Sequence, residues 1–208
     1  MKAVYITGCL GFIGSYVTRA CLKMGWYVKG VDKITYAARE ELLEEFNGYE
    51  NFSFIKEDIV NLETIHDCDY VINLAAESHV GNSIVSSDEF ISSNINGVHN
   101  TEKLIPKVCK YLKLGKKIPL HDRGLPKRNW LHAKDTAQAI IRVIESGKTN
   151  EIFNISGDFE QENIQTVNKI IELAYNGEVI DNQLIDLDYS RPGQDVRYSI
   201  DDSKLREL

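Results

Sequence analysis

Three glycines at three-residue spacing occur in the segment T-G-C-L-G-F-I-G-S, at Gly8, Gly11 and Gly14. The apolar run before them, residues 3–6, is typical of a buried strand, and Tyr16–Met24 after them has the apolar spacing of a helix that Gly25 would end. Glycines on a strand-to-helix turn allow a tight bend. They also let the backbone approach a pyrophosphate at the helix N-terminus. The segment therefore predicts a dinucleotide-binding loop.

An acidic residue, Asp32, ends the next apolar run, Tyr27–Val31. A carboxylate about 20 residues beyond such a loop suits the hydroxyls of an adenosine ribose. The same carboxylate would repel the 2′-phosphate of NADP, so the pattern favours NAD. The alternative is an ordinary strand–helix–strand turn followed by an incidental Asp.

Composition limits the classes of protein to consider. The chain has 208 residues, 43% of them apolar, which suits one domain or one domain with a small annex. A net charge of −7 and no basic stripe argue against nucleic acid as a partner. We see no leader and no apolar run of membrane-spanning length, which predicts a cytoplasmic protein that is not membrane-bound. The four cysteines lack metal spacing, so we expect buried free thiols and no metal site.

Alternating strand and helix patterns predict the fold class over the first hundred residues. Further strands are expected at Phe52–Lys56 and Tyr70–Leu74, a helix at Glu40–Phe46 and a helical turn at Glu63–Asp67. This alternation predicts an α/β, Rossmann-like parallel sheet with helices on both faces. Beyond it we expect a mostly helical stretch at Asp88–Leu114, a loop-rich basic stretch at Lys116–His132, helices at Asp135–Ser146 and Ile164–Tyr175, a strand at Glu151–Ile155, and an irregular tail from Asn182.

Several strings resemble one family. V-D-K-I-T-Y-A at 31–37, E-D-I at 57–59 and N-L-A-A-E-S-H-V at 73–80 join the glycine loop in resembling dTDP-glucose 4,6-dehydratases. These are NAD-dependent extended short-chain dehydrogenase/reductases that act on a nucleotide sugar. The second half continues the resemblance with K-L-I-P at 103–106, R-N-W-L-H-A-K-D at 128–135 and R-P-G-Q-D-V-R-Y at 191–198.

The resemblance implies a set of NAD-binding residues. The backbone N–H groups of Phe12 and Ile13 would bind the pyrophosphate, and Asp32 would bind the ribose. The other residues implied at the cofactor are Gly8, Gly11, Gly14, Lys33, Thr35, Asp58, Ile59, Leu74, Ala75, Ala76, Ser78 and Ser93. For Asp58, the position after a strand is equally typical of a residue that caps a helical turn.

The resemblance also implies a nucleotide sugar, dTDP- or UDP-linked, as substrate. A guanidinium at Arg128 suits a diphosphate by its bidentate geometry. Asn163 would lie near the nucleotide, or else serve only as the N-cap of the helix that follows it. The substrate-binding residues implied are Ser78, Lys103, Leu104, Arg128, Asn163, Arg191 and Gln194. The string His121–Gly124 stands where the family has Y-G-D-G, and Gln194 stands where it has His.

The usual catalytic segment of the family is missing. Between Gly97 and Lys103 the family has a strand ending in Thr-Asp-Glu, a helix with Tyr-x-x-x-Lys, and another strand. Here only five residues intervene, and none of the ten tyrosines has a lysine four positions later. At ~30 residues per strand–helix–strand unit, about 60–100 residues are lacking. The catalytic residues are therefore unknown. Weak candidates for replacing them are His79, Tyr36, His121 and His132, and the plain interpretation of each is a polar loop residue.

These observations predict a Rossmann-like protein with a reduced number of strands. An NAD-binding part would occupy 1–100, and a small nucleotide-sugar part would occupy 101–208. One hypothesis is a lyase or epimerase that uses substitute residues or groups from a second subunit. The alternatives are a non-catalytic NAD(H)-binding module or partner of a full-length homologue, and a decayed product. Loss of the segment would leave Tyr70–Leu74 at the sheet edge, partly covered by Glu151–Ile155. We therefore expect a homodimer that contacts through 88–114.

Overall fold

The computed structural model describes residues 1–62, 65, 67–76, 104–176, 184–189 and 195–208. Its contacts divide the chain into two compact units. Unit 1 contains Met1–Asn100, Ala133–Glu151 and Leu208, and unit 2 contains Thr101–His132 and Ile152–Glu207. We describe each unit by itself.

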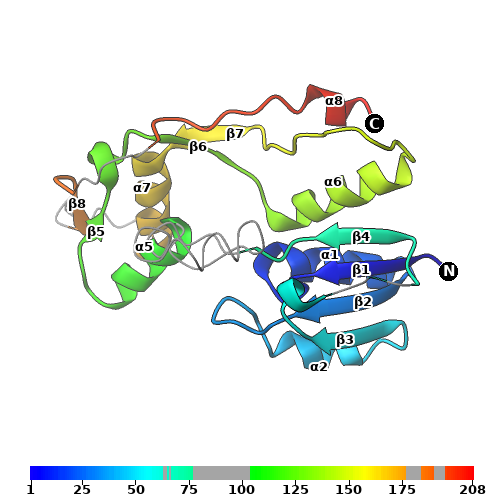
Figure 1. The fold of residues 1–208 in the computed structure, drawn as a ribbon. Helices are drawn as coiled ribbons and strands as arrows, with labels where there is room; N and C mark the ends of the chain where they lie inside the picture. The colour runs from blue at the N-terminus through cyan, green and yellow to red at the C-terminus, as the bar shows by residue number, and fades with distance from the viewer. Residues whose placement is uncertain (63–64, 66, 77–103, 177–183, 190–194) are drawn as a thin grey trace. The chain divides into compact units, whose positions relative to one another are not determined.

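Unit 1 is built on a parallel sheet, as predicted (Figure 1). Its strands are β1 (Ala3–Thr7), β2 (Tyr27–Asp32), β3 (Phe52–Lys56) and β4 (Tyr70–Asn73), in the order β3-β2-β1-β4. The register pairs Thr7 with Val31 on one side and with Asn73 on the other. The carboxyl ends of β1, β2 and β4 therefore meet at one edge of the sheet, where parallel α/β sheets bind ligands. Strand β4 is the outer strand of the described sheet.

Helices connect these strands and complete the core of unit 1. They are α1 (Phe12–Lys23), α2 (Leu42–Asn47), the 3-10 turn η1 (Ile59–Asn61) and α6 (Ala133–Glu145), and α1 packs on α6. Apolar side chains from the central strands and the helices form one buried cluster that includes Val4, Ile6, Val17, Val28, Phe46, Ile72, Ala137 and Ile141. Burial of this cluster fixes α1, and with it the glycine loop, against β1.

Unit 2 contains two short strand pairs beside two packed helices. Its elements are α5 (Leu104–Lys113), β5 (Ile118–Pro119), η2 (His121–Gly124), β6 (Lys127–Trp130), β7 (Phe159–Glu162), α7 (Asn163–Ala174), β8 (Ile185–Asp186) and α8 (Ser203–Arg206). Strands β6 and β7 pair antiparallel, and β5 pairs parallel with β8. The core of the unit is a second cluster made of Val108, Ile118, Leu120, Val167 and Ile185.

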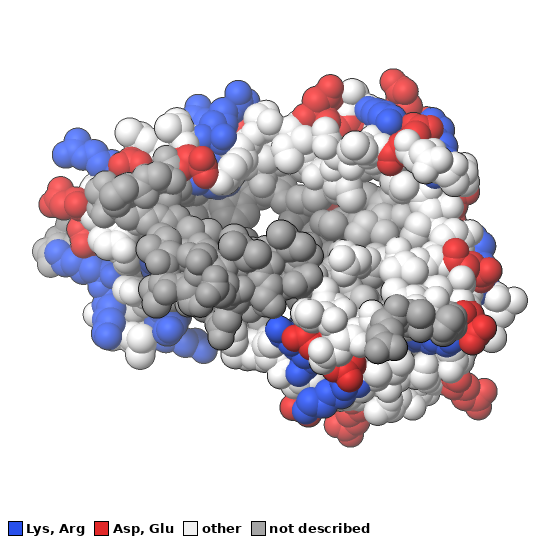
Figure 2. Space-filling view, in the orientation of Figure 1, with Lys and Arg blue, Asp and Glu red and all other residues white. Residues whose placement is uncertain are grey.

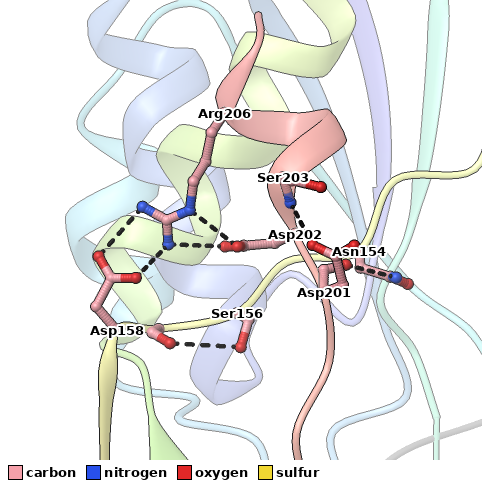
Figure 3. A network of polar contacts seen from close by, with 8 residues as sticks. Asn154, Ser156, Asp158, Asp201, Asp202, Ser203 and Arg206 are labelled. Atoms are coloured by element: carbon pink, nitrogen blue, oxygen red, sulfur yellow. Dashed lines mark hydrogen bonds and ion pairs between the residues drawn. The ribbon is translucent and has the colours of Figure 1, made fainter.

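A polar network attaches the C-terminal helix α8 to the rest of unit 2 (Figure 3). Both carboxylate oxygens of Asp158 and both of Asp202 accept hydrogen bonds from Arg206. The Asn154 amide donates to the carbonyl of Asp201 over 2.8 Å. The hydrogen bond from Arg206 lowers the pKa of Asp202. Because Arg206 and Asp158 are largely exposed, screened ion pairs of this kind contribute little stability.

The predicted strand Glu151–Ile155 is wrong, since the structure has no strand there and Ile152 is 84% exposed. A strand needs a neighbour for its backbone groups, and by resemblance the strands missing from this chain would lie beyond β4. The carbonyl of Ile152 accepts instead from the Lys204 ammonium over 2.9 Å.

Other predicted boundaries also need correction. Helix α1 begins four residues before the predicted start at Tyr16. The tail that was predicted to be irregular contains β8 and α8, and the stretch that was predicted to be loop-rich contains β5, η2 and β6. The four cysteines are free, as expected, but Cys109 is exposed rather than buried. The predicted turn Glu63–Asp67 lies partly, and the stretch 88–103 wholly, outside the described residues.

Candidate functional site

The glycine loop forms a close-packed turn between β1 and α1. Gly8 adopts φ +67°, and a Cβ there would lie 2.7 Å from the backbone nitrogen of Ala75. A Cβ on Gly14 would lie 1.9 Å from the carbonyl oxygen of Gly8. Gly11 is the N-cap residue, and its N–H donates to that same carbonyl over 3.0 Å. Larger residues at Gly8 or Gly14 would therefore push the loop open.

The N-terminus of α1 is accessible. The side chains of Phe12 and Ile13, its first two residues, are 64% and 38% exposed. The first N–H groups of a helix have no acceptor within the helix, and the helix dipole makes this end positive. The end of α1 is therefore suited to the negative charge of a phosphate.

The Thr7 hydroxyl joins the carboxyl ends of β1 and β4. It donates to Asn73 Oδ1 and accepts from the backbone N–H groups of Leu74 and Ala75, each over 3.2 Å. These bonds fix the predicted cofactor-lining segment Leu74–Ala76 beside the glycine loop. The role of Thr7 is not evident from sequence, because it depends on β4 pairing next to β1.

The carboxylate of Asp32 lies against the glycine loop. It accepts a hydrogen bond from the Leu10 N–H over 3.1 Å and another from the Ile34 N–H over 2.9 Å. Burial raises the pKa of Asp32, while the Ile34 and Leu10 N–H groups and the nearby Lys33 act in the opposite direction. The carboxylate is therefore held in one orientation, with lone pairs left for a further donor.

Ile34, which donates its N–H to Asp32, has a strained backbone conformation. Its φ is +55°, and the left-handed region is disfavoured for a β-branched residue by about 1–3 kcal/mol. Its N–H is one of the two donors to Asp32. Sequence reasoning missed this residue because nothing in the string D-K-I-T-Y-A shows a positive φ.

Asp58 follows β3 and is the N-cap residue of the 3-10 turn η1. One of its oxygens accepts from the Val60 N–H over 3.1 Å, and the other pairs with the Lys33 ammonium over 3.1 Å. Burial tends to raise the pKa of Asp58, but the Val60 N–H and Lys33 outweigh burial and lower it. The cap interpretation of Asp58 is therefore correct, and it places Lys33 and Ile59 beside that carboxylate.

Arg128 is partly buried in unit 2. It lies on β6 and donates to the carbonyls of Lys127 and Asp195 over 2.6 and 3.0 Å. Its guanidinium stacks 4.6 Å from the centre of the Tyr198 ring. No carboxylate pairs with Arg128 among the residues that the structure describes, so its charge is available to an anion.

Asn163 is not the N-cap of α7, which corrects one of its two predicted roles. The cap is Glu162, in a capping box with Gln165, and Asn163 is the first residue of the helix. Its Oδ1 is buried and has no hydrogen-bond partner within the described parts of the chain. Asn129 Oδ1 and Trp130 Nε1 on β6 share this property. Buried polar atoms rarely lack a partner, so these three atoms indicate a ligand or water.

The turn η2 packs near the start of α7 in a strained conformation. Asp122 and Arg123 have φ of +46° and +58°, and Gly124 has φ of +75°. A Cβ on Gly124 would lie 2.8 Å from Cβ of Ile164. The His121 ring lies 4.5 Å from the ring of Tyr189. Positive φ at three successive residues is typical of a functional loop.

The first stretch of unit 2 is basic although the whole chain is acidic. Residues 103–128 contain nine Lys or Arg and one Asp. In Figure 2, blue side chains gather at the left, in the part that Figure 1 labels α5 and β5. A positive field here favours an anionic ligand over a neutral one.

The remaining predicted site residues fall into two groups. Tyr36 and His132 are exposed in unit 1 and unit 2, respectively, and Leu104 is half-buried at the start of α5. Ser78, His79, Ser93, Lys103, Arg191 and Gln194 lie outside the described residues. Within the described residues, no group of His, Cys, Asp or Glu could hold a metal ion, and no helix is long and apolar enough to cross a membrane.

Comparisons with known proteins match most of this chain. Residues 5–101 match the family described as GDP-mannose 4,6 dehydratase, and residues 96–156 match the NAD dependent epimerase/dehydratase family. A probable dTDP-glucose 4,6-dehydratase of Sinorhizobium fredii is 27% identical, covering 97% of this chain and 85% of its own length. The dTDP-glucose 4,6-dehydratase of Haemophilus influenzae is 25% identical, covering 99% and 91%.

These alignments run over 300 and 308 positions, although the chain has 208 residues. Each relative therefore has internal residues with no counterpart here. Among solved structures, the dTDP-glucose 4,6-dehydratase DesIV of Streptomyces venezuelae, with NAD bound, superimposes with a TM-score of 0.86 at 21% identity. That match covers 99% of this chain and 90% of DesIV. A UDP-N-acetylglucosamine 4-epimerase of Methanobrevibacter ruminantium gives 0.80 at 19%, covering 99% and 91%. The structural matches show a shared fold.

Proposed function

We propose that the chain is a dTDP-glucose 4,6-dehydratase-like protein of the extended short-chain dehydrogenase/reductases and that it binds NAD and a nucleotide sugar. The observation that carries the proposal is the Asp32 carboxylate, fixed by the Leu10 and Ile34 N–H groups against the glycine loop. The Asp32 carboxylate is an acceptor for ribose hydroxyls, and the N-terminus of α1 is accessible to a phosphate. Together these two features fit the adenosine half of a dinucleotide.

Each part of NAD has a residue to bind it in unit 1. The N–H groups of Phe12 and Ile13 would bind the pyrophosphate, and Asp32 would accept the ribose hydroxyls. The segment Leu74–Ala76, held by Thr7, would line the remainder. When bound, NAD supplies a hydride acceptor. The role of these residues is to orient it. Relatives with this fold have been solved with NAD bound.

Unit 2 would bind the nucleotide sugar. Arg128 offers the diphosphate a guanidinium that has no carboxylate partner among the described residues, and Asn163 Oδ1 offers a buried acceptor that a nucleobase or ribose donor could satisfy. Structures similar to this chain include UDP-sugar complexes of two epimerases and a dTDP-glucose 4,6-dehydratase, so both linkages are candidates. Ser78, Lys103, Arg191 and Gln194 stay predictions by resemblance.

We propose that ordinary dehydratase turnover is absent. The reaction requires a base for the 4-hydroxyl proton, an acid for the leaving hydroxyl and a base for the C5 proton. Each such group contributes a factor of ~10²–10⁴ to the rate. The unmatched internal positions of the relatives agree with the loss of Tyr-x-x-x-Lys and Thr-Asp-Glu. The alternative, a lyase that uses His79, Tyr36 or His121, requires one of them to reach the sugar.

Two measurements test this proposal separately. Calorimetry with NAD should show saturable binding, and its failure would remove the NAD assignment. Incubation with NAD and dTDP-glucose should yield no 4-keto product. Product formation would favour the lyase alternative over the non-catalytic module.

We also propose a cytoplasmic homodimer. Its support is the position of β4 as outer strand of the described sheet, with Val71 51% exposed. Light scattering that gives 23.6 kDa, the mass of one chain, at micromolar concentration would refute the dimer.

A further inference from the structure

An arginine outside the predicted site residues lies along the glycine loop. The N–H of Arg39 donates to the carbonyl of Leu10 over 3.0 Å, and its Nη2 donates to the hydroxyl of Ser15. Leu10 also donates its own N–H to Asp32. A single residue, Leu10, therefore links the backbone of Arg39 to the carboxylate proposed to bind the ribose. Its side chain extends from there to the first turns of α1.

The charge of Arg39 has no counter-ion among the described residues. The nearest candidate, Glu45, has both carboxylate oxygens bonded to Arg19. Arg39 is close enough to contribute to lowering the pKa of Glu45, yet it makes no ion pair with it. Its Nε is buried and has no acceptor within the described parts of the chain. Arg39 thus brings a second guanidinium close to Glu45, an acid that Arg19 already neutralises.

A partly buried guanidinium without a carboxylate partner costs free energy, because the buried Nε loses water and gains no acceptor. An anion at the loop would recover that cost. Ser15 and Leu10 both belong to the segment that surrounds the end of α1, and that end attracts negative charge by itself. Two independent features, the helix end and the unpaired arginine, therefore favour an anion at the same loop.

We propose that Arg39 is a phosphate ligand for the adenosine half of the dinucleotide. The proposal rests on the proposed dinucleotide-binding function and assigns to it a residue outside the glycine pattern. The phosphate belongs to one of two chemically similar sources, the diphosphate bridge or a 2′-phosphate on the ribose beside Asp32. In both cases a planar guanidinium, anchored by Ser15, would hold the phosphate oxygens in a fixed direction.

Calorimetry with three probes tests the assignment: ADP, 2′,5′-ADP and adenosine. Arg39→Gln should weaken ADP or 2′,5′-ADP by about 10- to 100-fold, as expected for a charge-assisted hydrogen bond, and leave adenosine unchanged. Weakening of ADP identifies the bridge as the source, and weakening of 2′,5′-ADP alone identifies the 2′-phosphate. Arg39→Lys keeps the charge and should recover part of the affinity. Lys23→Gln removes an exposed charge from the far end of α1 and is the matched control.

A thermal scan separates ligand binding from a structural role. Without nucleotide, Arg39→Gln should unfold at the temperature of the parent or above it, because the parent carries an unpaired charge. A clear drop in that temperature, or unchanged affinity for both phosphate probes, overturns the assignment of Arg39 and leaves the proposed function intact. If the parent binds neither ADP nor 2′,5′-ADP, the assignment and the proposed dinucleotide function both fail.

Discussion

Replacing Asp32 by Asn tests the cofactor site at its best-defined group. The carboxylate accepts one backbone N–H on each oxygen, from Leu10 and from Ile34. An amide has one oxygen, so one of these N–H groups would face an NH₂ group and lose its acceptor. An unsatisfied buried donor costs about 1–3 kcal/mol. We expect Asp32→Asn to lower the free energy of unfolding by this amount, less what is gained by no longer burying a charge.

The same substitution should reduce the affinity for NAD. A hydrogen bond to a charged acceptor contributes about 1.5–3 kcal/mol, which corresponds to about 10- to 100-fold in Kd. Asp69→Asn is the matched control, because Asp69 also accepts a backbone N–H, from Ala3 over 2.7 Å, at the opposite end of β1. Calorimetry on both variants measures the difference. An NAD affinity of Asp32→Asn within twofold of the parent, or equal NAD and NADP affinities in the parent, would refute the reasoning.

The raised pKa of Asp32 adds a dependence on pH. Because burial raises the pKa of Asp32, the folded protein binds this proton more tightly than the unfolded chain does, and the contribution of Asp32 to stability falls as the pH rises through the raised pKa. Ribose hydroxyls donate to the charged form. NAD affinity should therefore fall as the pH drops through that same pKa, with proton release on binding. Asp32→Asn should lose both effects, as calorimetry in two buffers of different ionisation enthalpy would show.

Three further predictions concern the loop, the chemistry and the assembly. Gly14→Ala should abolish NAD binding, since its Cβ would lie 1.9 Å from the Gly8 carbonyl oxygen; calorimetry that finds parental affinity contradicts this. The turnover of dTDP-glucose should be many orders of magnitude below the enzyme median of ~10 s⁻¹, measured as 4-keto product. Charge placed at Ile91 or Ile95 should convert the dimer to a monomer in light scattering, and an unchanged mass places the interface elsewhere.

The sequence was sufficient to predict elements whose pattern is local. The strands β1 to β3 and the stop of α1 at Gly25 follow from apolar runs and glycines, and the alternation of strands and helices predicts a parallel sheet. Gly25 indeed adopts φ +73° at the end of α1. The first turn of α1 was missed because the glycine loop overlaps it, and glycines argue against a helix.

Features of the site that depend on contacts distant in sequence were not predictable. The Thr7 hydroxyl bonds to residues 66 to 68 positions away, and the Ile34 strain depends on how Asp32 is held. Arg39 lacks an ion pair with Glu45 because both carboxylate oxygens of Glu45 are bonded to Arg19. Each of these follows only once the strands are in register and the side chains compete for partners.

The wrong strand prediction at Glu151–Ile155 shows that strand formation depends on segments distant in the sequence. The strand at Glu151–Ile155 was predicted from the apolar composition of the segment, and composition does not show whether a neighbouring strand is present. Strand formation also needs neighbouring backbone, and here Lys204 and the carbonyl of Asp201 supply polar partners to the segment instead. The Asp32 carboxylate is held by the Leu10 and Ile34 N–H groups, and the strands β1 to β3 that position it are all present in this chain. Loss of the catalytic segment therefore removes proton-transfer groups and sheet strands together, while the geometry that would bind NAD remains independent of it.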